Sequence, residues 1–303
     1  APRMTGKTSK NTKKKKRIMN NIGFIGLGVM GAPMAGHLSQ KGYNLSVFNR
    51  SVHKSKLWKS QYKGVITSSL DDLALNSDVI ILCVKKDEDV RNIINEIKDF
   101  IKPNSIVIDH TTTSAELAKE MHDILKERQS SFLDAPVSGG EAGAKLGKLS
   151  IMVGGDKDIF SLASKILSCY SKFTKFMGPS GHGQLTKMVN QICIAGLIQA
   201  LAEGLNFSEK AGLNSSDVIE VISQGAAQSW QMENRWETML ADQYEHGFAV
   251  DLMRKDLVIV KKQAELIGAN IEVTKLVNNF YQDIQDMGGG NWDTSSLLKR
   301  LKD

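Results

Sequence analysis

Short apolar segments alternate with longer stretches of helical periodicity between residues 21 and 154. The central segments are apolar at consecutive positions, as is typical of parallel strands buried on both faces of a sheet. Strands that alternate with helices predict an α/β fold with a doubly wound parallel sheet. The predicted strands are 22–26, 45–49, 64–67, 78–84, 105–110, 132–136 and 149–154, and the predicted helices are 30–41, 90–98 and 114–128.

The pattern changes at 178–183, a cluster of helix-breaking residues with three glycines and a proline. A long proline-free stretch, 184–211, follows with apolar residues at helical spacing, and no convincing strand comes after it. The predicted helices there are 184–211, 216–223, 250–266 and 273–287. We therefore expect a dinucleotide-binding domain over 21–182, an all-α domain over 183–303, and a long helix that links them.

The net charge of +6 is concentrated at the start of the chain. Residues 1–20 carry eight Lys and Arg and no acid, which leaves 31 basic and 33 acidic residues in the remainder. We interpret 1–20 as a basic, disordered, solvated tail. The alternative is an arm that binds nucleic acid, or a localisation signal.

Cys83, Cys169 and Cys193 lie in apolar surroundings without a C-x-x-C spacing or a nearby His. This usage argues against a disulfide framework and predicts no metal site. We expect a reducing compartment and a cytoplasmic location. The longest uninterrupted apolar run is 79–84, far short of the length that crosses a bilayer, so we expect no membrane contact.

A glycine motif joins the first predicted strand to the first predicted helix. In such a loop the first glycine permits a tight turn, the second leaves room for a pyrophosphate, and the third lets helix and strand approach closely. Free N–H groups at the helix start attract the phosphates. The alternative is a glycine-rich turn without a ligand. The predicted cofactor loop is Gly26, Leu27, Gly28, Val29, Met30 and Gly31.

The end of the second predicted strand indicates which dinucleotide binds. NAD sites usually carry Asp or Glu there, but this chain has Asn49, Arg50 and Ser51. The Arg50 guanidinium is suited to pair with a 2′-phosphate, and Asn49 and Ser51 are suited to hydrogen-bond beside it. The sequence therefore favours NADP, with NAD as the alternative and a solvated loop cation as the other interpretation of Arg50.

Four motifs in one order resemble the β-hydroxyacid dehydrogenases, a family that includes 3-hydroxyisobutyrate dehydrogenase, tartronate semialdehyde reductase and the glyoxylate/succinic semialdehyde reductases. The motifs are 26–31, 134–140, 181–190 and Lys255-Asp256, and the resemblance covers essentially all of 21–303. It implies a Rossmann domain, a long interdomain helix and a small helical domain. It also implies reversible NAD(P)-linked oxidation of a 3-hydroxy acid.

Such a reaction needs a group that exchanges a proton with the substrate oxygen. Lys187 lies near the start of the long helix, where partial burial and the helix end would lower its pKa. By position alone it could equally be a surface lysine, and the family motif favours the catalytic role. Asn190 shares its helix face and is suited to orient the lysine or the substrate. Many relatives carry Asn four residues after the lysine, where this chain has Gln191, so either amide is a candidate.

The resemblance also implies where the substrate binds. Ser138, Gly139 and Gly140 follow a strand, and the family holds the substrate carboxylate with the corresponding hydroxyl and N–H groups. The alternative is a plain β-turn. Trp230 is either a wall of the substrate pocket or a core residue.

Further cofactor contacts follow from the same resemblance. Thr112 matches the position near the nicotinamide ribose, although it is also a candidate N-cap for the helix 114–128. Lys255 matches a lysine that reaches the cofactor from the helical domain, with a charged helix face as the alternative, and Phe248 is expected nearby. We also assign Val84 and Lys85, where the strand 78–84 ends, to the cofactor site.

The sequence therefore predicts an NADP-preferring oxidoreductase that acts on a short 3-hydroxy acid or semialdehyde. One alternative is a non-catalytic chromatin or nucleic-acid scaffold that uses the basic tail, which the presence of Lys187 disfavours. An imine reductase of the same fold is disfavoured because those relatives usually replace the lysine. The apolar run 192–205 favours a homo-oligomer, either a dimer or a tetramer.

Overall fold

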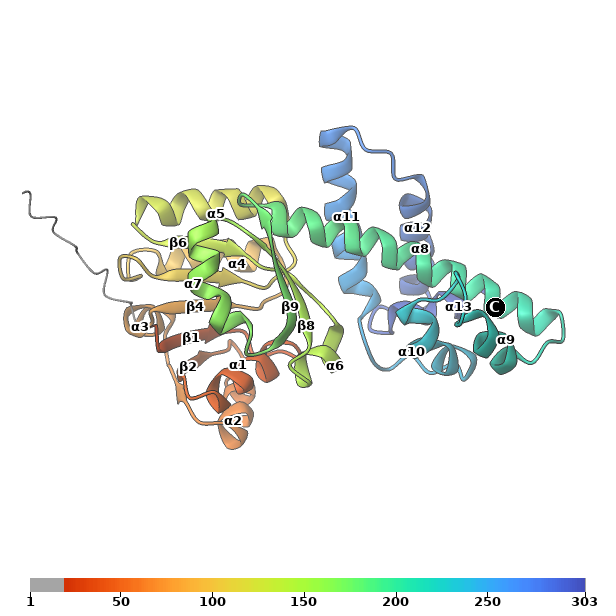
Figure 1. Ribbon diagram of the computed structural model, residues 1–303, viewed down its shortest axis with the longest axis horizontal. Coiled ribbons are helices and arrows are strands. Elements are labelled where there is room, and N and C mark those ends of the chain that lie inside the picture. Colours follow the sequence, from red (N-terminus) through yellow and green to blue (C-terminus); the bar gives the residue numbers. More distant parts are fainter. Residues whose placement is uncertain (1–18, 303) are drawn as a thin grey trace, which may run out of the picture.

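The structure, a computed structural model, describes residues 19–302 (Figure 1). Most of the predicted basic tail, residues 1–18, lies outside the described residues. The first half of the chain forms a nine-stranded sheet in the order β3-β2-β1-β4-β5-β6-β8-β7, with β9 paired to β8. The strands are β1 Asn21–Ile25, β2 Asn44–Phe48, β3 Val65–Ile66, β4 Val79–Leu82, β5 Ile106–Asp109, β6 Ser131–Asp134, β7 Val137–Ser138, β8 Leu149–Gly154 and β9 Ser171–Gly178.

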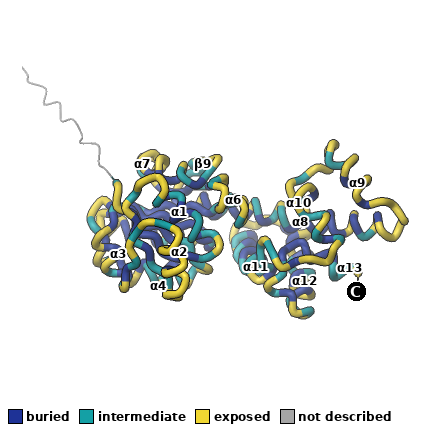
Figure 2. Tube along the Cα trace, turned by 90° about the horizontal axis from the view of Figure 1, so that it is seen from below, coloured by how far each residue is buried: buried dark blue, intermediate teal, exposed yellow. Residues whose placement is uncertain are grey.

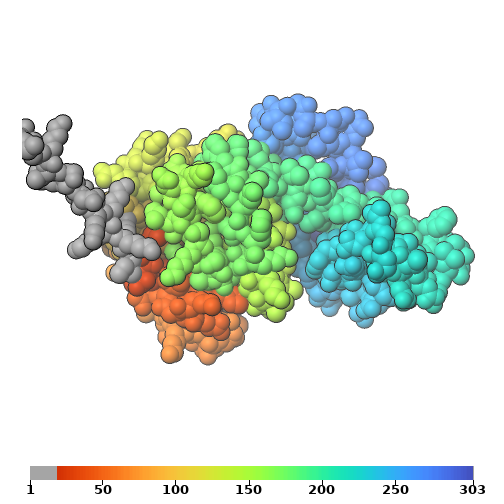
Figure 3. Space-filling view, in the orientation of Figure 1, coloured from red at the N-terminus to blue at the C-terminus, as the bar shows by residue number. Residues whose placement is uncertain are grey.

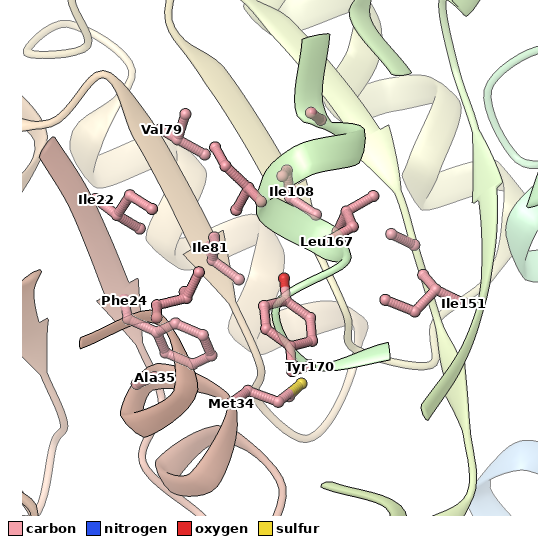
Figure 4. Packing of buried hydrophobic residues seen from close by; sticks show 14 of the residues in the cluster. Ile22, Phe24, Met34, Ala35, Val79, Ile81, Ile108, Ile151, Leu167 and Tyr170 are labelled. Carbon is pink, nitrogen blue, oxygen red and sulfur yellow. The ribbon is translucent and has the colours of Figure 1, made fainter. Parts of the chain in front are cut away.

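Helices cover both faces of this sheet, as predicted for a doubly wound fold. Residues 22–170 supply two apolar clusters, one on each face. The first lies under α1 and α7 and includes Phe24, Met34 and Tyr170 (Figure 4). The second lies under α3, α4 and α5. The helices of this half are α1 Gly31–Gln40, α2 Val52–Gln61, α3 Leu70–Asn76, α4 Asp87–Ile97, α5 Ala115–Glu127, α6 Gly140–Lys145 and α7 Lys157–Leu167.

The strands from β3 to β6 are parallel, but β8 runs antiparallel to β6 and β7. The direction reverses because β7 and α6 bring the chain back along the same edge as a hairpin instead of a full crossover. Simple alternation along the sequence does not reveal this reversal. It places Ser138, at the end of β7, on an open sheet edge beside the second half of the molecule.

The second half is helical, as predicted. Its apolar side chains, from residues 188–298, form a separate cluster that includes residues of α8. Buried residues occur along the helices of this half as well as in the sheet of the first half (Figure 2). The space-filling view shows two lobes that meet where α8 crosses between them (Figure 3). Its helices are α8 His182–Lys210, α9 Ser215–Ile222, α10 Trp230–Leu240, α11 Val250–Ile267, α12 Glu272–Asp286, the 3₁₀ turn η1 Thr294–Ser296 and α13 Leu297–Lys302.

α8 is the element that joins the two lobes (Figure 1). Among residues 19–302 it is the single helix that is long and apolar enough to cross a membrane by length and composition. It also packs against α10, α11, α12 and α13. Its buried face carries Gln184, Lys187 and Gln191, a polar content that suits the interior of a protein better than lipid.

Candidate active site

The site lies at the carboxyl ends of the central strands. β1 pairs with β2 on one side and with β4 on the other, so the chain order reverses between β1 and β4. Open α/β sheets bind their ligands at such a switch point. The predicted glycine loop follows β1 directly and ends where α1 begins.

The three glycines of this loop have the different surroundings that a dinucleotide site needs. A Cβ on Gly26 would lie 2.2 Å from the Cys83 carbonyl oxygen, and Gly26 has a φ of +100°. A Cβ on Gly31 would lie 1.9 Å from the Gly26 carbonyl oxygen. A Cβ on Gly28 meets nothing within 4 Å, so open space lies beside that glycine. Open space beside this glycine is what a bound pyrophosphate would require.

The start of α1 supports the same interpretation. Its N-cap residue, Met30, makes no side-chain cap hydrogen bond, and the first turn holds no acidic residue. The Ala32 N–H is already bonded to the Gly28 carbonyl at 3.0 Å and Pro33 has no N–H, so an anion at this end would meet the N–H groups that precede Ala32. Leu27 and Val29 complete the loop, with Leu27 buried and Val29 exposed.

The Asn49 side chain holds the loop in place. Its Oδ1 accepts a hydrogen bond from the Leu27 N–H at 2.9 Å, and its Nδ2 donates to the Ser51 carbonyl at 3.1 Å. Asn49 therefore shapes the cofactor loop from within the protein. Arg50 is exposed, close enough to Lys86 for the two charges to interact, and Ser51 is the N-cap of α2 without a side-chain cap bond. Arg50 and the start of α2 therefore lie directly after β2, where a 2′-phosphate would be expected, while Lys86 is paired with Glu88 at 2.7 Å.

Lys187 is buried at the junction of the lobes, with 8% of its surface exposed. Its Nζ donates a hydrogen bond to the Val137 carbonyl at 2.8 Å, next to Ser138. Burial lowers the pKa of Lys187 from its usual 10.5 to about 8, while Asp256 acts to raise it and Lys255 to lower it. A lysine with this pKa can both donate and accept a proton near neutral pH.

The first turn of α8 is fixed by side chains that the sequence analysis did not assign. Asp134, at the end of β6, accepts hydrogen bonds from the Gly181 and Gln184 N–H groups at 2.8 and 3.0 Å. Burial raises the pKa of Asp134 to about 6. The Gln184 amide bonds both the Thr111 carbonyl and the Thr113 N–H. These contacts determine where Lys187, one turn further along, enters the cleft.

Ser138 joins a chain of polar contacts that crosses from β7 to α8. The Ser138 hydroxyl is 3.4 Å from Asn190 Oδ1, Asn190 Nδ2 donates to Gln191 Oε1 at 2.9 Å, and Gln191 Nε2 donates to Asp256 at 2.7 Å. The two amides therefore have different partners. Asn190 faces the serine and Gln191 faces α11. Within residues 19–302, the hydrogen bond found for the Lys187 amine goes to the Val137 carbonyl instead of to either amide.

Gly139 and Gly140 follow Ser138, at the predicted carboxylate-binding position. Gly139 has a φ of +128° and Gly140 a φ of +59°, and a Cβ on Gly140 would meet nothing within 4 Å. Both residues are exposed beside the Ser138 hydroxyl. A Cβ on Gly139 would lie 3.3 Å from Leu149 Cδ2, so the open space lies beside Gly140.

Lys255 reaches from α11 to the first lobe. Its Nζ donates to the carbonyls of Lys85 and Thr112 at 2.9 and 2.7 Å and forms an ion pair with Asp256 at 3.0 Å. The Val84 N–H is bonded to the Thr111 hydroxyl at 3.0 Å, which fixes the adjacent loop. Lys255 thus links the loops after β4 and β5 to the helical lobe. The alternative, that it only belongs to a charged helix face, is wrong.

Some assignments from the sequence change. Ser114 caps α5 through a bond from the Leu117 N–H, so the alternative role of Thr112 as the N-cap is wrong. Trp230 is 52% exposed with Arg235 over its ring, so the alternative that it belongs to the core is wrong.

Two other side chains have contacts that hold them within the fold. Phe248 packs against the apolar cluster of the helical lobe, two turns before Lys255, and its backbone bonds Asp293 and Thr294. His110 is buried between the Ala135 carbonyl and the Tyr170 hydroxyl. Burial lowers the pKa of His110 to about 4, which is consistent with a structural role for a neutral ring.

A Rossmann lobe with this glycine loop, a helical lobe and a buried lysine between them define a dinucleotide-dependent oxidoreductase. Residues 21–179 match the family described as the NAD binding domain of 6-phosphogluconate dehydrogenase. Residues 181–301 match the family described as the NAD-binding domain of NADP-dependent 3-hydroxyisobutyrate dehydrogenase.

Proteins similar to this chain cover nearly all of it. An uncharacterized oxidoreductase of Shewanella frigidimarina is 49% identical over 94% of this chain and 99% of its own length. The 2-hydroxy-3-oxopropionate reductase of Escherichia coli is 31% identical over 93% of this chain and 97% of its own. The 3-hydroxyisobutyrate dehydrogenase of Mycobacterium tuberculosis, solved with L-serine, is 27% identical with a TM-score of 0.87, over 94% of this chain and 100% of that one.

The chain belongs to the β-hydroxyacid dehydrogenase family, and it is an NAD(P)-dependent oxidoreductase.

Proposed function

We propose that this enzyme interconverts a short 3-hydroxy acid and the corresponding semialdehyde or oxo acid, with Lys187 as the general acid and base. The observation that carries this proposal is the buried Lys187 amine, held 2.8 Å from the Val137 carbonyl and adjacent to Ser138. Bound NADP would accept the hydride in oxidation, and NADPH would supply it in reduction.

The proton balance is handled by Lys187. When the carbonyl is reduced, its oxygen gains negative charge and the Lys187 ammonium donates a proton to it. When the alcohol is oxidised, the neutral amine accepts the hydroxyl proton. Burial lowers the pKa of Lys187 to about 8, so both forms are present near neutral pH.

The substrate carboxylate would be held by the Ser138 hydroxyl and by the N–H groups of Gly139 and Gly140. Asn190, 3.4 Å from the Ser138 hydroxyl, would contact the substrate beside it. Trp230 lies half-exposed at the start of α10. We propose that its ring forms one wall of the substrate site, at the outer end. A short acid fits this set of groups better than a phosphorylated one, which would require more cations.

We infer that NADP is preferred over NAD. Arg50, with Lys86 nearby, would pair with the 2′-phosphate, and the uncapped start of α2 at Ser51 would add N–H donors. A carboxylate that would repel this phosphate is absent from the predicted position, 49–51. We also propose a cytoplasmic location and a homo-oligomer, a dimer or a tetramer.

The test is an assay of short 3-hydroxy acids and their semialdehydes with both nucleotides, across about pH 6 to 10. We expect one substrate of this class to be turned over with a higher kcat/KM for the NADP pair. Since burial lowers the pKa of Lys187 to about 8, the ammonium form is lost as the pH rises through that value. Reduction should therefore slow above about pH 8, and oxidation should accelerate. Turnover of none of these acids, or equal use of both nucleotides, would contradict the corresponding part of the proposal.

A further inference from the structure

Asp256 is a buried acid on α11 that contacts two predicted site residues at once. Only 2% of its surface is exposed. Its Oδ2 accepts a hydrogen bond from Gln191 Nε2 at 2.7 Å, and its Oδ1 forms an ion pair with Lys255 Nζ at 3.0 Å. A charge buried this deeply is costly unless its partners are well placed. Its position therefore indicates a role beyond covering the helix surface.

The contacts of Asp256 lie in the middle of a continuous path across the cleft. On one side, Lys255 is bonded to the Lys85 and Thr112 carbonyls, at the cofactor loops. On the other side, Gln191 is bonded to Asn190, which faces the Ser138 hydroxyl. Asp256 thus joins the predicted cofactor side of the site to the predicted carboxylate side.

Lys187 lies four residues before Gln191 on α8, and both are buried, so the two side chains share the helix face that meets Asp256. Asp256 raises the pKa of Lys187 and Lys255 lowers it, against the larger lowering caused by burial. Both of these charged groups come from α11, and from β7 the amine meets the uncharged Val137 carbonyl. The charge at Asp256 is therefore a local determinant of how readily Lys187 holds its proton.

We propose that Asp256 is a positioning residue of the active site, which holds Gln191 and Lys255 in place together and supplies the buried negative charge beside Lys187. This inference rests on the proposed role of Lys187 as the proton donor and acceptor. The proposal depends on Gln191, whose side chain is longer than the Asn that many relatives carry at this position. The Gln191 amide donates a hydrogen bond to Asp256, and the neighbouring Asn190 faces Ser138.

A purely structural role for Asp256 makes a different prediction. If Asp256 only fastened α11 to α8, its replacement would lower stability but would leave the titration of Lys187 where it was. The pH at which the Lys187 amine becomes reactive therefore separates the two roles. This quantity is measured on the protein without cofactor or substrate.

The experiment is competitive acetylation of the full chain with trace acetic anhydride across a pH series, followed by mass spectrometry of the Lys187 peptide. In the unaltered protein the midpoint should be near pH 8. In Asp256→Asn it should fall by about one pH unit or more, because the opposite charge is gone. In Asp256→Glu, which keeps the negative charge, the midpoint should lie close to that of the unaltered protein. An unchanged midpoint in a folded Asp256→Asn would overturn the proposal.

The matched control is Glu265→Gln, which removes an exposed acid from the same helix and should leave the midpoint unchanged. Circular dichroism checks the folding of each variant. If Asp256→Asn does not fold, Asp256→Ser removes the same charge with a smaller side chain. The midpoint should again fall, and a midpoint that stays or rises would overturn the proposal.

The outcome is separable from that of the proposed function. If Lys187→Ala keeps full turnover, Lys187 is not the general acid and base. This conclusion would hold for any acetylation midpoint measured in the unaltered protein. If Lys187→Ala is inactive but Asp256→Asn titrates like the unaltered protein, the proposed function stands and the role given to Asp256 is wrong.

Discussion

Gly28 and Gly31 lie three residues apart in the cofactor loop and meet different surroundings. Gly31 is a glycine because the Gly26 carbonyl occupies the space where a Cβ would go. Gly28 is bordered by open space, so the folded chain alone gives no reason for its lack of a side chain. The reason we infer is the bound pyrophosphate.

This contrast gives a paired prediction. Gly31→Ala should lower the free energy of unfolding by about 1–3 kcal/mol or more, because the loop must move away from α1. Gly28→Ala should leave that free energy nearly unchanged and weaken NADPH binding at least about tenfold, because the methyl group occupies ligand space. Urea unfolding and NADPH fluorescence titration measure the two effects. Equal stability losses in both variants, or unaltered NADPH binding in Gly28→Ala, would contradict this interpretation.

Single residues were predictable where a local motif carries the chemistry. The glycine loop, Arg50 and Lys187 each stand at a position that the sequence marks. The residues that hold them were not predictable, because their contacts join distant parts of the chain. Asp134 meets Gln184 across 50 positions, and Gln191 meets Asp256 across 65. Asp134 and Asp256 lie inside the motifs that carry the family resemblance. Their place in these motifs indicates that they have a role, but it does not indicate which role.

Elements were predictable where they are buried. Each of the seven predicted strands has a counterpart in the sheet, and the long helix predicted at 184–211 is α8, His182–Lys210. The strands β7 and β9 were missed: β7 has two residues, and β9 is only partly buried. α2 was missed because Ser55 and Trp58 alone are buried along its ten residues.

The hydrophobic pattern also does not predict the antiparallel edge of the sheet. The alternation of buried and partly buried residues in β8 would be the same for a parallel or an antiparallel strand, and its direction depends on the hairpin with β7. The same edge carries Ser138 and the Val137 carbonyl that holds Lys187. The irregular part of the sheet therefore carries the residues to which we assign the substrate carboxylate.

The whole molecule consists of two lobes joined by α8 and fastened across the cleft by Lys255. Several large apolar side chains are exposed on α8 and α9, with Val189, Leu197, Phe207 and Val221 each at least 42% exposed. Beside Leu197, a cavity of about 300 Å³ lies between α8, α9 and α10. Exposed apolar side chains on a long helix favour self-association.

Sedimentation velocity tests this proposal. At micromolar concentration the chain should sediment as a dimer or a tetramer, and Leu197→Glu should shift it toward the monomer because a charge would be buried in the contact. Leu266→Glu, at a more exposed leucine near the end of α11, is the control and should not shift it. A monomer in the unaltered protein would contradict the proposed oligomer.

The most direct measurement is the turnover of Lys187→Ala beside its affinity for NADPH. Loss of a positioned acid and base should reduce kcat by about 10²–10⁴-fold, while the dissociation constant for NADPH stays within about twofold, since the phosphates bind elsewhere. Lys210→Ala, at the exposed far end of the same helix, should keep normal turnover. Full turnover in Lys187→Ala would contradict the assignment of this amine as the proton donor and acceptor.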